Sequence, residues 1–386
     1  MPTVNVNIQP AIINWALSQT YEEQLGSKLM KNIRHWLDGT KTPTFKQIED
    51  FSKKSNIPLG YFFLQTPPVE PLHLLDYRTV DSIHLANPSR NLIETIHEME
   101  NVQDWMIHYR RDTGFDVLPL VGSMNVCTDV KVIVDTIRDD LSLRDNWYED
   151  CGNMNEAFNM IRSLLEECGI VVMQSGIVGK NTHRALDIEE FRAFAMPDEW
   201  APLIFINSAD SQGAKLFSLF HEAAHIWLGV SDLYNDRRDS KNVKPIEVLC
   251  NSIASELMVP TDNFIEKWDA STVKDIFEKV RELSKKFKCG ESVIARKALD
   301  NKRINQSIYA EVIENSIAAY REMKDNRESG GGNYYNTMGS RLDGRFIKAL
   351  CESISTGRTT FTEAYRLTNT SRKTFTEIAA RQGGIQ

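Results

Sequence analysis

The chain has 386 residues, enough for two or three domains, and its 41% hydrophobic and 25% charged residues are typical of a soluble globular protein. Its formal net charge of -8 argues against non-specific nucleic-acid binding by the chain as a whole, but it leaves room for a local basic face. Six scattered cysteines without a Cys-x-x-Cys pair, no evident signal peptide and no long apolar run lead us to expect a cytoplasmic protein with reduced thiols and no membrane span.

Residues 1–66 are predicted to form a small helical domain. Apolar residues recur at helical spacing in three segments, which are 11–18, 21–38 and 44–55. Thr44 and Gln47 stand three residues apart at the start of the last segment, which is the spacing of a capping box. This pattern predicts three helices joined by turns.

The stretch from Trp36 to Phe63 resembles the end of a phage-repressor-type helix-turn-helix domain. A helix that reads DNA needs several polar and basic side chains directed at base edges. The preceding stretch supplies only a few of them: Lys28, Lys31, Asn32 and Arg34. Two roles therefore stay open for this domain, namely DNA binding and a retained fold that makes protein contacts.

Residues 67–150 are predicted to be a linker followed by a helical region. Three prolines between Pro67 and Pro71 indicate a stiff linker, and the motif Asp76-Tyr-Arg-Thr79 follows it. Apolar residues at helical spacing predict helices over 88–112 and 130–143.

Residues 151–325 begin with a predicted helix over 155–168 and continue with predicted strands and helices. Three short apolar segments are read as strands: 169–173, 191–196 and 203–206.

The segment from Ala214 to Gly229 is an apolar helical pattern that contains His221-Glu-Ala-Ala-His225. His221 and His225 are four residues apart, so they share one helix face and can bind one metal ion. Zinc lowers the pKa of a coordinated water towards ~7, and a neighbouring carboxylate such as Glu222 can take its proton. The spacing therefore predicts metal-assisted hydrolysis of an amide bond. The alternative is a pair of core histidines hydrogen-bonded to their neighbours.

A third ligand is expected from the next helical pattern, 245–260, because a catalytic zinc usually has three protein ligands. Glu247 and Glu256 are nine residues apart, which is about 900° or two and a half turns of a helix, so their side chains point to roughly opposite faces. Only one of them can therefore face the metal, and we favour Glu247. Cys250 is a softer candidate ligand, although a buried core residue is the interpretation we prefer.

In zinc proteases an extended substrate pairs with the edge of the sheet, and we expect Ala193 to Ala195 to lie near that edge. His183 precedes this strand in a loop and is a candidate for stabilising the oxyanion. The alternative role for His183 is a hydrogen bond that anchors the loop.

Residues 326–386 are predicted to be a C-terminal helical tail after the flexible run Gly330–Gly332. Its expected helices cover 341–355, 360–367 and 373–381, and the last two have the rhythm of a small helix-turn-helix. From Arg341 onward the net charge is +4. The tail is therefore predicted either to contact DNA or an acidic partner, or to be a plain helical cap.

Residues 155–300 resemble the ImmA/IrrE family of metallo-endopeptidases well beyond the histidine motif. The matching segments are Gly169–Met173, Gly176–Asp187, Glu190–Ala195, Ala201–Asn207, Ala214–Gly229, Glu247–Ala254 and Leu257–Pro260. This resemblance implies a bound Zn²⁺, with His221, His225 and Glu247 as its ligands and Glu222 as the catalytic base. Cys250 replaces the small alanine that is usual in the family, which is a mild departure. Known members cut helix-turn-helix repressors, and others are linked to toxin–antitoxin pairs.

We therefore predict an α+β, mostly helical fold with a zincin-like core, in which a small three-stranded sheet packs on the zinc helix between helical terminal units. The leading functional hypothesis is a regulatory zinc endopeptidase that cleaves a repressor or antitoxin encoded nearby. The alternative is an antitoxin or DNA- or protein-binding regulator with little or no proteolysis. DNA is a possible partner of the terminal units in either case.

Overall fold

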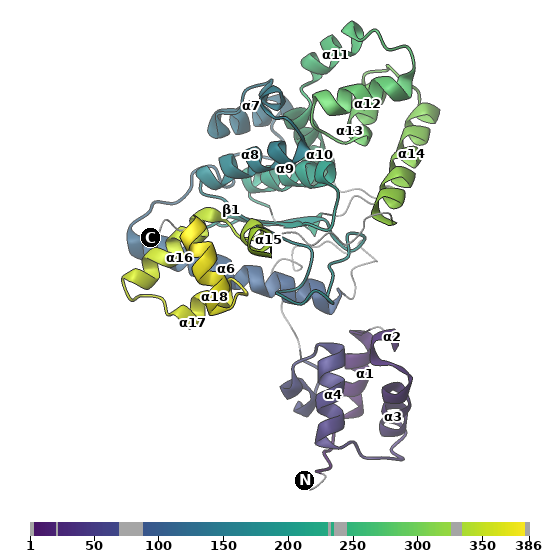
Figure 1. The fold of residues 1–386 in the computed structure, drawn as a ribbon, viewed down its shortest axis with the longest axis vertical. Helices are drawn as coiled ribbons and strands as arrows, with labels where there is room; N and C mark the ends of the chain where they lie inside the picture. Colours follow the sequence, from purple (N-terminus) through teal and green to yellow (C-terminus); the bar gives the residue numbers. More distant parts are fainter. Residues whose placement is uncertain are drawn as a thin grey trace. The chain divides into compact units, whose positions relative to one another are not determined.

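The computed structural model describes residues 4–20, 22–68, 88–230, 233–234, 245–325 and 334–382 (Figure 1). The chain divides into two compact units, 1–97 and 98–386, and the division falls inside helix α6 (Arg90–Thr113). This division differs from the predicted boundaries at 66/67 and 150/151. The motif 76–79 and the glycine run 330–332 lie outside the described residues.

The first unit is helical. Its elements are α1 (Pro10–Ser18), α2 (Glu22–Leu25), α3 (Ser27–Leu37), α4 (Phe45–Ser55) and the 3-10 helix η1 (Leu59–Phe63). The capping box is confirmed, because the Gln47 amide donates to Thr44 Oγ1 (3.3 Å) and the Thr44 amide donates to Gln47 Oε1 (2.9 Å). One helix over 21–38 was the wrong prediction: Gly26, with a φ of 75°, separates α2 from α3, and this left-handed conformation cannot continue a helix.

The second unit is built on a small mixed sheet with strand order β1-β3-β2-β4. The strands are β1 (Val171–Ser175), β2 (Ala193–Met196), β3 (Leu203–Asn207) and β4 (Leu233–Tyr234). β1 runs parallel to β3, whereas β2 runs antiparallel to both β3 and β4. Ala193 to Ala195 were expected near the sheet edge, and β2 is the strand next to that edge: the two-residue strand β4 pairs with it at Ala193 and Phe194. A strand of two residues that follows the histidine motif in the chain is too short to give an alternating sequence pattern.

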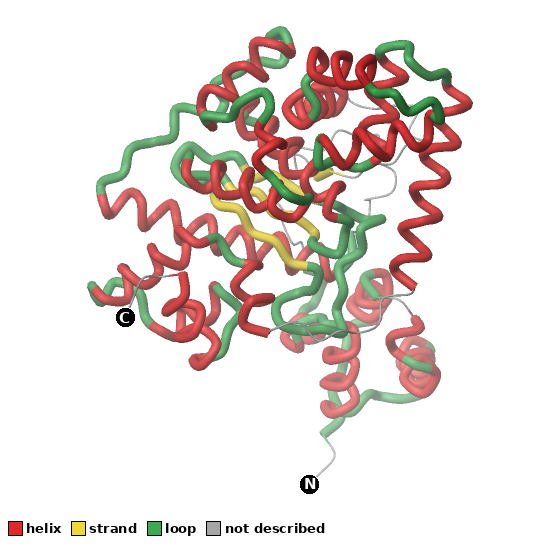
Figure 2. The backbone as a smooth tube through the Cα atoms, turned by 45° about the horizontal axis from the view of Figure 1, so that its top comes forward, coloured by secondary structure: helices red, strands yellow, loops and turns green. Residues whose placement is uncertain are grey.

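Helices surround the sheet, so the predicted mostly helical α+β class is confirmed. They are α7 (Val130–Leu141), η3 (Trp147–Asp150), α8 (Met154–Glu167), α9 (Gln212–Leu228), α10 (Pro245–Met258), α11 (Thr261–Ala270), α12 (Ile276–Lys286), α13 (Glu291–Asp300), α14 (Gln306–Asp325), α15 (Tyr334–Arg341), α16 (Gly344–Ser355), α17 (Phe361–Leu367) and α18 (Arg372–Gln382). Figures 1 and 2 show α8 and α9 on one face of the sheet, with α10 beside α9. None of the described helices is long and apolar enough to cross a membrane. All six cysteines lie in the described ranges and carry free thiols.

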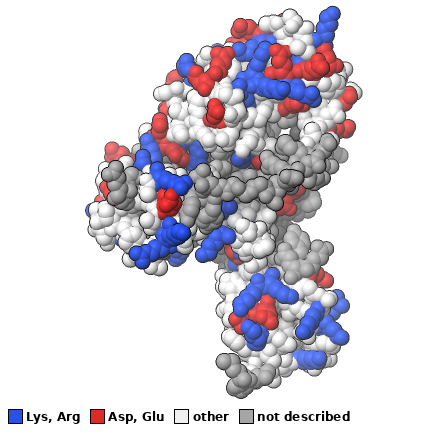
Figure 3. Space-filling view, in the orientation of Figure 1, with Lys and Arg blue, Asp and Glu red and all other residues white. Residues whose placement is uncertain are grey.

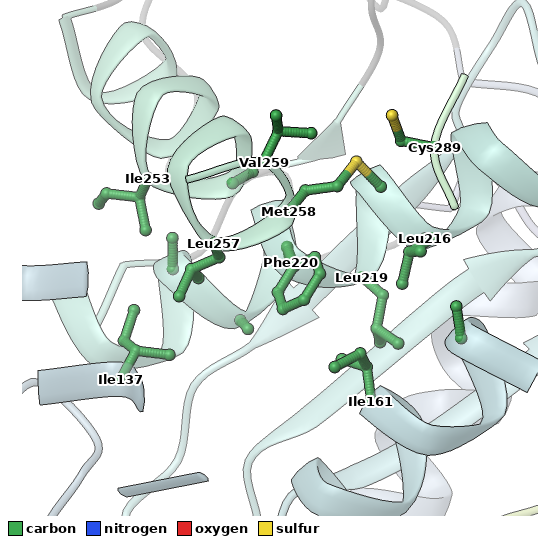
Figure 4. Packing of buried hydrophobic residues seen from close by; sticks show 14 of the residues in the cluster. Ile137, Ile161, Leu216, Leu219, Phe220, Ile253, Leu257, Met258, Val259 and Cys289 are labelled. Atoms are coloured by element: carbon green, nitrogen blue, oxygen red, sulfur yellow. The ribbon is translucent and has the colours of Figure 1, made fainter. Parts of the chain in front are cut away.

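The main apolar core fixes α9 against α10 (Figure 4). Phe220 of α9 lies beside Leu257 of α10 and Leu216 belongs to the same cluster, and each of the three side chains is completely buried. Burying one such side chain contributes about 1.5–3 kcal/mol, so this interface holds the two helices in a fixed register. Trp147 joins the same core and donates its indole N–H to the Leu257 carbonyl (3.0 Å). The segment predicted as a linker and helical region thus supplies part of the core that supports the histidine motif.

A buried polar network attaches the C-terminal helices to the free edge of β1. Asp343, which precedes α16 and is 1% exposed, accepts hydrogen bonds from the amides of Val172 (3.0 Å) and Phe346 (2.8 Å). Arg162 of α8 donates to the carbonyls of Val172 (2.9 Å) and Leu342 (2.6 Å). The edge strand therefore finds hydrogen-bond partners that the sheet itself does not provide.

Glu166 gives this network a pH dependence. Burial, followed by the nearby Asp343 carboxylate, raises the pKa of Glu166 from 4.5 to about 7, and its ion pair with Arg162 only partly offsets this. Because the folded pKa lies above the ordinary value, the stability from protonated Glu166 is present below pH 4.5 and is lost as the pH rises through about 7.

We expect Glu166→Gln to melt like the wild type at pH 4.5 and to be more stable by about 1–3 kcal/mol at pH 8. Thermal unfolding followed by circular dichroism at both pH values measures this difference, with Glu311→Gln on the exposed side of α14 as the control. A difference in stability between Glu166→Gln and wild type that is the same at both pH values would contradict the raised pKa of Glu166.

Candidate metal centre

Helix α9 carries the histidine motif and has a capping residue at each end. Ser211 Oγ accepts a hydrogen bond from the Ala214 amide (3.3 Å), which caps the first turn. Gly229 ends the helix with a φ of 67°, as its position in the sequence predicted.

The C-terminal end of α9 is also held by a segment far away in the sequence. The amides of Gly122 and Met124 donate to the carbonyls of Ile226 (3.0 Å) and Trp227 (2.9 Å) in the last turn of the helix, where carbonyls lack the regular intrahelical partner. A Cβ at Gly229 would lie 2.8 Å from the Gly122 Cα, so this close approach requires glycine. Nothing in the local pattern of residues 122–124 predicts this contact.

His221 and His225 of α9 and Glu247 of α10 converge on one point. The two Nε2 atoms lie 3.1 Å apart, and Glu247 carboxylate oxygens lie 3.2 Å from His221 Nε2 and 3.3 Å from His225 Nε2. The imidazoles are almost fully buried, while 18% of the Glu247 side chain is exposed. Within the described parts of the chain, no other group of three histidine, cysteine or acidic side chains comes this close together.

These distances are close to those between neighbouring ligand atoms of a tetrahedral metal ion. Zinc–nitrogen and zinc–oxygen bonds of about 2.0–2.2 Å place neighbouring ligand atoms of a tetrahedron about 3.3–3.6 Å apart. Two imidazole nitrogens and one carboxylate oxygen also form a common donor set of catalytic zinc sites, and they leave a fourth position open. The three residues are thus suited to hold Zn²⁺.

The protonation states favour metal binding as well. Burial, which outweighs the attraction of Glu247, lowers the pKa of His221 and keeps this imidazole neutral. Burial alone would raise the pKa of Glu247, but its hydrogen bonds to the two histidines lower it below the ordinary value, so the carboxylate is ionised. Neutral imidazole and ionised carboxylate are the forms that bind a metal.

Asn251 of α10 had no predicted role, but it contacts one of the converging histidines. Its Oδ1 accepts a hydrogen bond from His221 Nδ1 (3.0 Å), so the proton of the neutral imidazole sits on Nδ1 and the Nε2 lone pair faces the cluster. Asn251 lies four residues after Glu247 on the same face of α10, and this spacing is the signal that could have revealed it.

We expect Asn251→Ala to weaken zinc binding by about 10- to 100-fold, because His221 loses the partner that fixes its tautomer and orientation. Competition with a chromophoric chelator measures the zinc affinity. Asn263→Ala on α11, whose side chain contacts Tyr148 and not the cluster, is the matched control. Equal affinities of the two variants would rule out the positioning role of Asn251.

Glu222 is completely buried and follows His221 directly on α9. The other sequence candidates lie elsewhere. Glu256 is held by Lys297 and Thr261, and Cys250 packs inside the apolar core. His183 is exposed between β1 and β2, and the structure shows no hydrogen bond or ion pair between it and the three converging residues. The arrangement thus combines three ligand side chains with one buried carboxylate.

Comparison with known families agrees with this geometry. Residues 165–299 match the peptidase M78 family model, described as an IrrE N-terminal-like domain, and this supports a metallopeptidase of the ImmA/IrrE kind. Residues 342–381 match the model of a domain of unknown function (DUF8813). No curated protein and no solved structure gives a significant match to the chain.

Proposed function

We propose that this protein is a regulatory zinc-dependent endopeptidase that cleaves a partner transcriptional repressor or antitoxin. The observation that carries the proposal is the convergence of His221, His225 and Glu247 within 3.1–3.3 Å of one another, beside the buried Glu222. The peptidase M78 match over the same helices supports the reaction class.

His221, His225 and Glu247 would hold the metal, and Asn251 orients the first of them. When bound, zinc supplies a water of lowered pKa and a positive charge that polarises the scissile carbonyl. The Glu222 carboxylate accepts a proton from the attacking water and then donates it to the leaving amine. The near-complete burial of both histidines and of Glu222 keeps bulk water away from these charges, which strengthens their interactions.

The proposed substrate is a protein encoded beside this gene, either a helix-turn-helix repressor or a member of a toxin–antitoxin pair. The IrrE-like domain supports a regulatory rather than a digestive protease. The six free thiols support a cytoplasmic setting for the reaction.

The deciding experiment is intact-mass spectrometry of each neighbouring gene product, co-expressed with the wild type or with Glu222→Gln. Fragments that appear only with the wild type would establish the protease and locate its cleavage site. Intact partners in both cases would refute cleavage of these substrates.

A second candidate is a binding regulator or antitoxin, and the exposed face of α3 favours it. Lys28, Lys31 and Arg34 are exposed on this helix, whereas Ile33 and Trp36 face the core of the first unit. A partner that co-purifies intact with both the wild type and Glu222→Gln would favour this role over proteolysis.

A further inference from the structure

The C-terminal end of the chain forms two helices joined by a sharp turn. α17 ends at Leu367 and α18 begins at Arg372, and Asn369 in the turn has a φ of 52°. A short turn of three or four residues with one left-handed position joins the two helices of a helix-turn-helix. This arrangement belongs to the segment that matches a domain of unknown function, so no role is assigned to it.

The inner faces of the two helices form a packed core. Ala364 and Leu367 of α17 are buried together with Phe375 and Ile378 of α18. Tyr365 meets Phe375 edge-on, with ring centroids 5.6 Å apart. Helix α16 also packs against α18. The outward face of α18 is therefore held in a fixed orientation.

Positive charge dominates the surface of these helices, although the whole chain carries a net charge of -8. The exposed basic residues between 344 and 382 are Arg345, Lys348, Arg358, Arg366, Arg372, Lys373 and Arg381. The same range holds three acidic residues: Glu352 is exposed and accepts a hydrogen bond from Tyr109 (2.8 Å), Glu363 is half-buried, and Glu377 forms an ion pair with Arg381 (2.8 Å). Figure 3 shows Lys and Arg side chains gathered over α17 and α18. Such a surface complements a polyanion.

The outward face of α18 is narrow and polar. Arg372, Thr376 and Ala380 follow one another at four-residue spacing and are exposed, with Lys373 beside them. Arginine pairs with guanine in the major groove, and threonine or alanine contacts the thymine methyl group. No large apolar side chain is exposed along α18, whereas the centre of a protein interface is typically apolar. These features favour DNA over an acidic protein as the partner.

We propose that α17 and α18 form a DNA-binding helix-turn-helix that is separate from the metal centre. Helix α18 enters the major groove, where Arg372 and Thr376 reach base edges. Lys373 and Arg366 contact the flanking phosphates. The protein would then bring its peptidase domain to DNA sites where a partner regulator is bound.

The test is fluorescence anisotropy of a 5′-labelled mixed-sequence duplex of about 30 base pairs, titrated with the full-length protein at several NaCl concentrations. Arg372→Glu/Lys373→Glu is compared with Lys285→Glu/Lys286→Glu on the exposed face of α12, which changes the net charge equally. We expect the first variant to bind about 10-fold or more weakly than wild type and to lower the salt slope by about 1–2. The α12 variant should stay within about 2-fold of wild type.

A third variant, Lys28→Glu/Lys31→Glu, separates any contribution of the first unit. Equal affinities of the α18 and α12 variants would overturn the proposal, and so would wild-type protein that shows no salt-dependent binding. Binding that is lost only in the Lys28→Glu/Lys31→Glu variant would also overturn it. Arg372→Lys, which keeps the charge but removes the bidentate fork, should change sequence preference more than total affinity.

Discussion

Glu222→Gln is expected to slow substrate cleavage by about 10²- to 10⁴-fold while zinc stays bound. Glutamine has nearly the same size and shape as glutamate, but it cannot take a proton from water at neutral pH. Glu222 is not one of the three converging residues, so His221, His225 and Glu247 are unchanged in this variant. The loss should therefore fall on the chemical step and not on metal content.

The measurement is single-turnover cleavage of the partner identified by co-expression, with zinc determined by atomic emission on the same samples. Glu314→Gln, an exposed change on α14, controls for removing one carboxylate. Cleavage by Glu222→Gln at the wild-type rate would be incompatible with its role as the base. A parallel loss of zinc would instead mean that Glu222 supports the metal.

Glu247→Gln and Glu256→Gln are expected to have opposite effects, although both residues are glutamates on α10. Glu247 faces His221 and His225, whereas Glu256 accepts hydrogen bonds from Lys297 and from the Thr261 amide (2.8 Å). Glu247→Gln should leave less than ~0.1 zinc per chain and little activity, because a neutral amide is a poor zinc ligand. Its metal-free protein should unfold near the temperature of metal-free wild type.

Glu256→Gln should keep about one zinc per chain but lose stability. Lys297 is 7% exposed on its side chain, and breaking a buried ion pair by removing one partner costs about 3–5 kcal/mol. For a unit of this size, this loss corresponds to a melting temperature about 5–15 °C lower. Zinc analysis and thermal unfolding of both variants provide the comparison. Retention of zinc by Glu247→Gln, or loss of zinc from a folded Glu256→Gln, would contradict the choice of Glu247 as the zinc ligand.

The largest part of the site was accessible from sequence because it depends on local spacing. His221 and His225 share one face of α9 whatever surrounds the helix, and Glu222 lies beside them by the same geometry. Gly229 at the helix end and the Thr44–Gln47 capping box were confirmed for a similar reason, since each involves residues only a few positions apart. The peptidase M78 match covers the segment in which these local patterns are most complete.

The error at residues 21–38 shows the limit of periodicity. Apolar spacing continues across Gly26, but the backbone at this glycine adopts a φ of 75° and divides the segment into two helices. Glycine permits this conformation without requiring it, so the sequence leaves both continuous and divided helices possible. The packing of the first unit selects the divided form.

Local sequence was sufficient to predict the histidine helix, the carboxylate beside it and the mostly helical class, because each follows from residues within one or two helical turns. Helical geometry also predicted that only one of Glu247 and Glu256 can face the two histidines, and the packing of α10 on α9 placed Glu247 there. Asn251 reached His221 by the same packing. Two further contacts join residues more than a hundred positions apart: Gly122 binds the end of α9, and Asp343 binds the edge of β1. Such contacts depend on how whole elements pack, and no spacing along the chain encodes them.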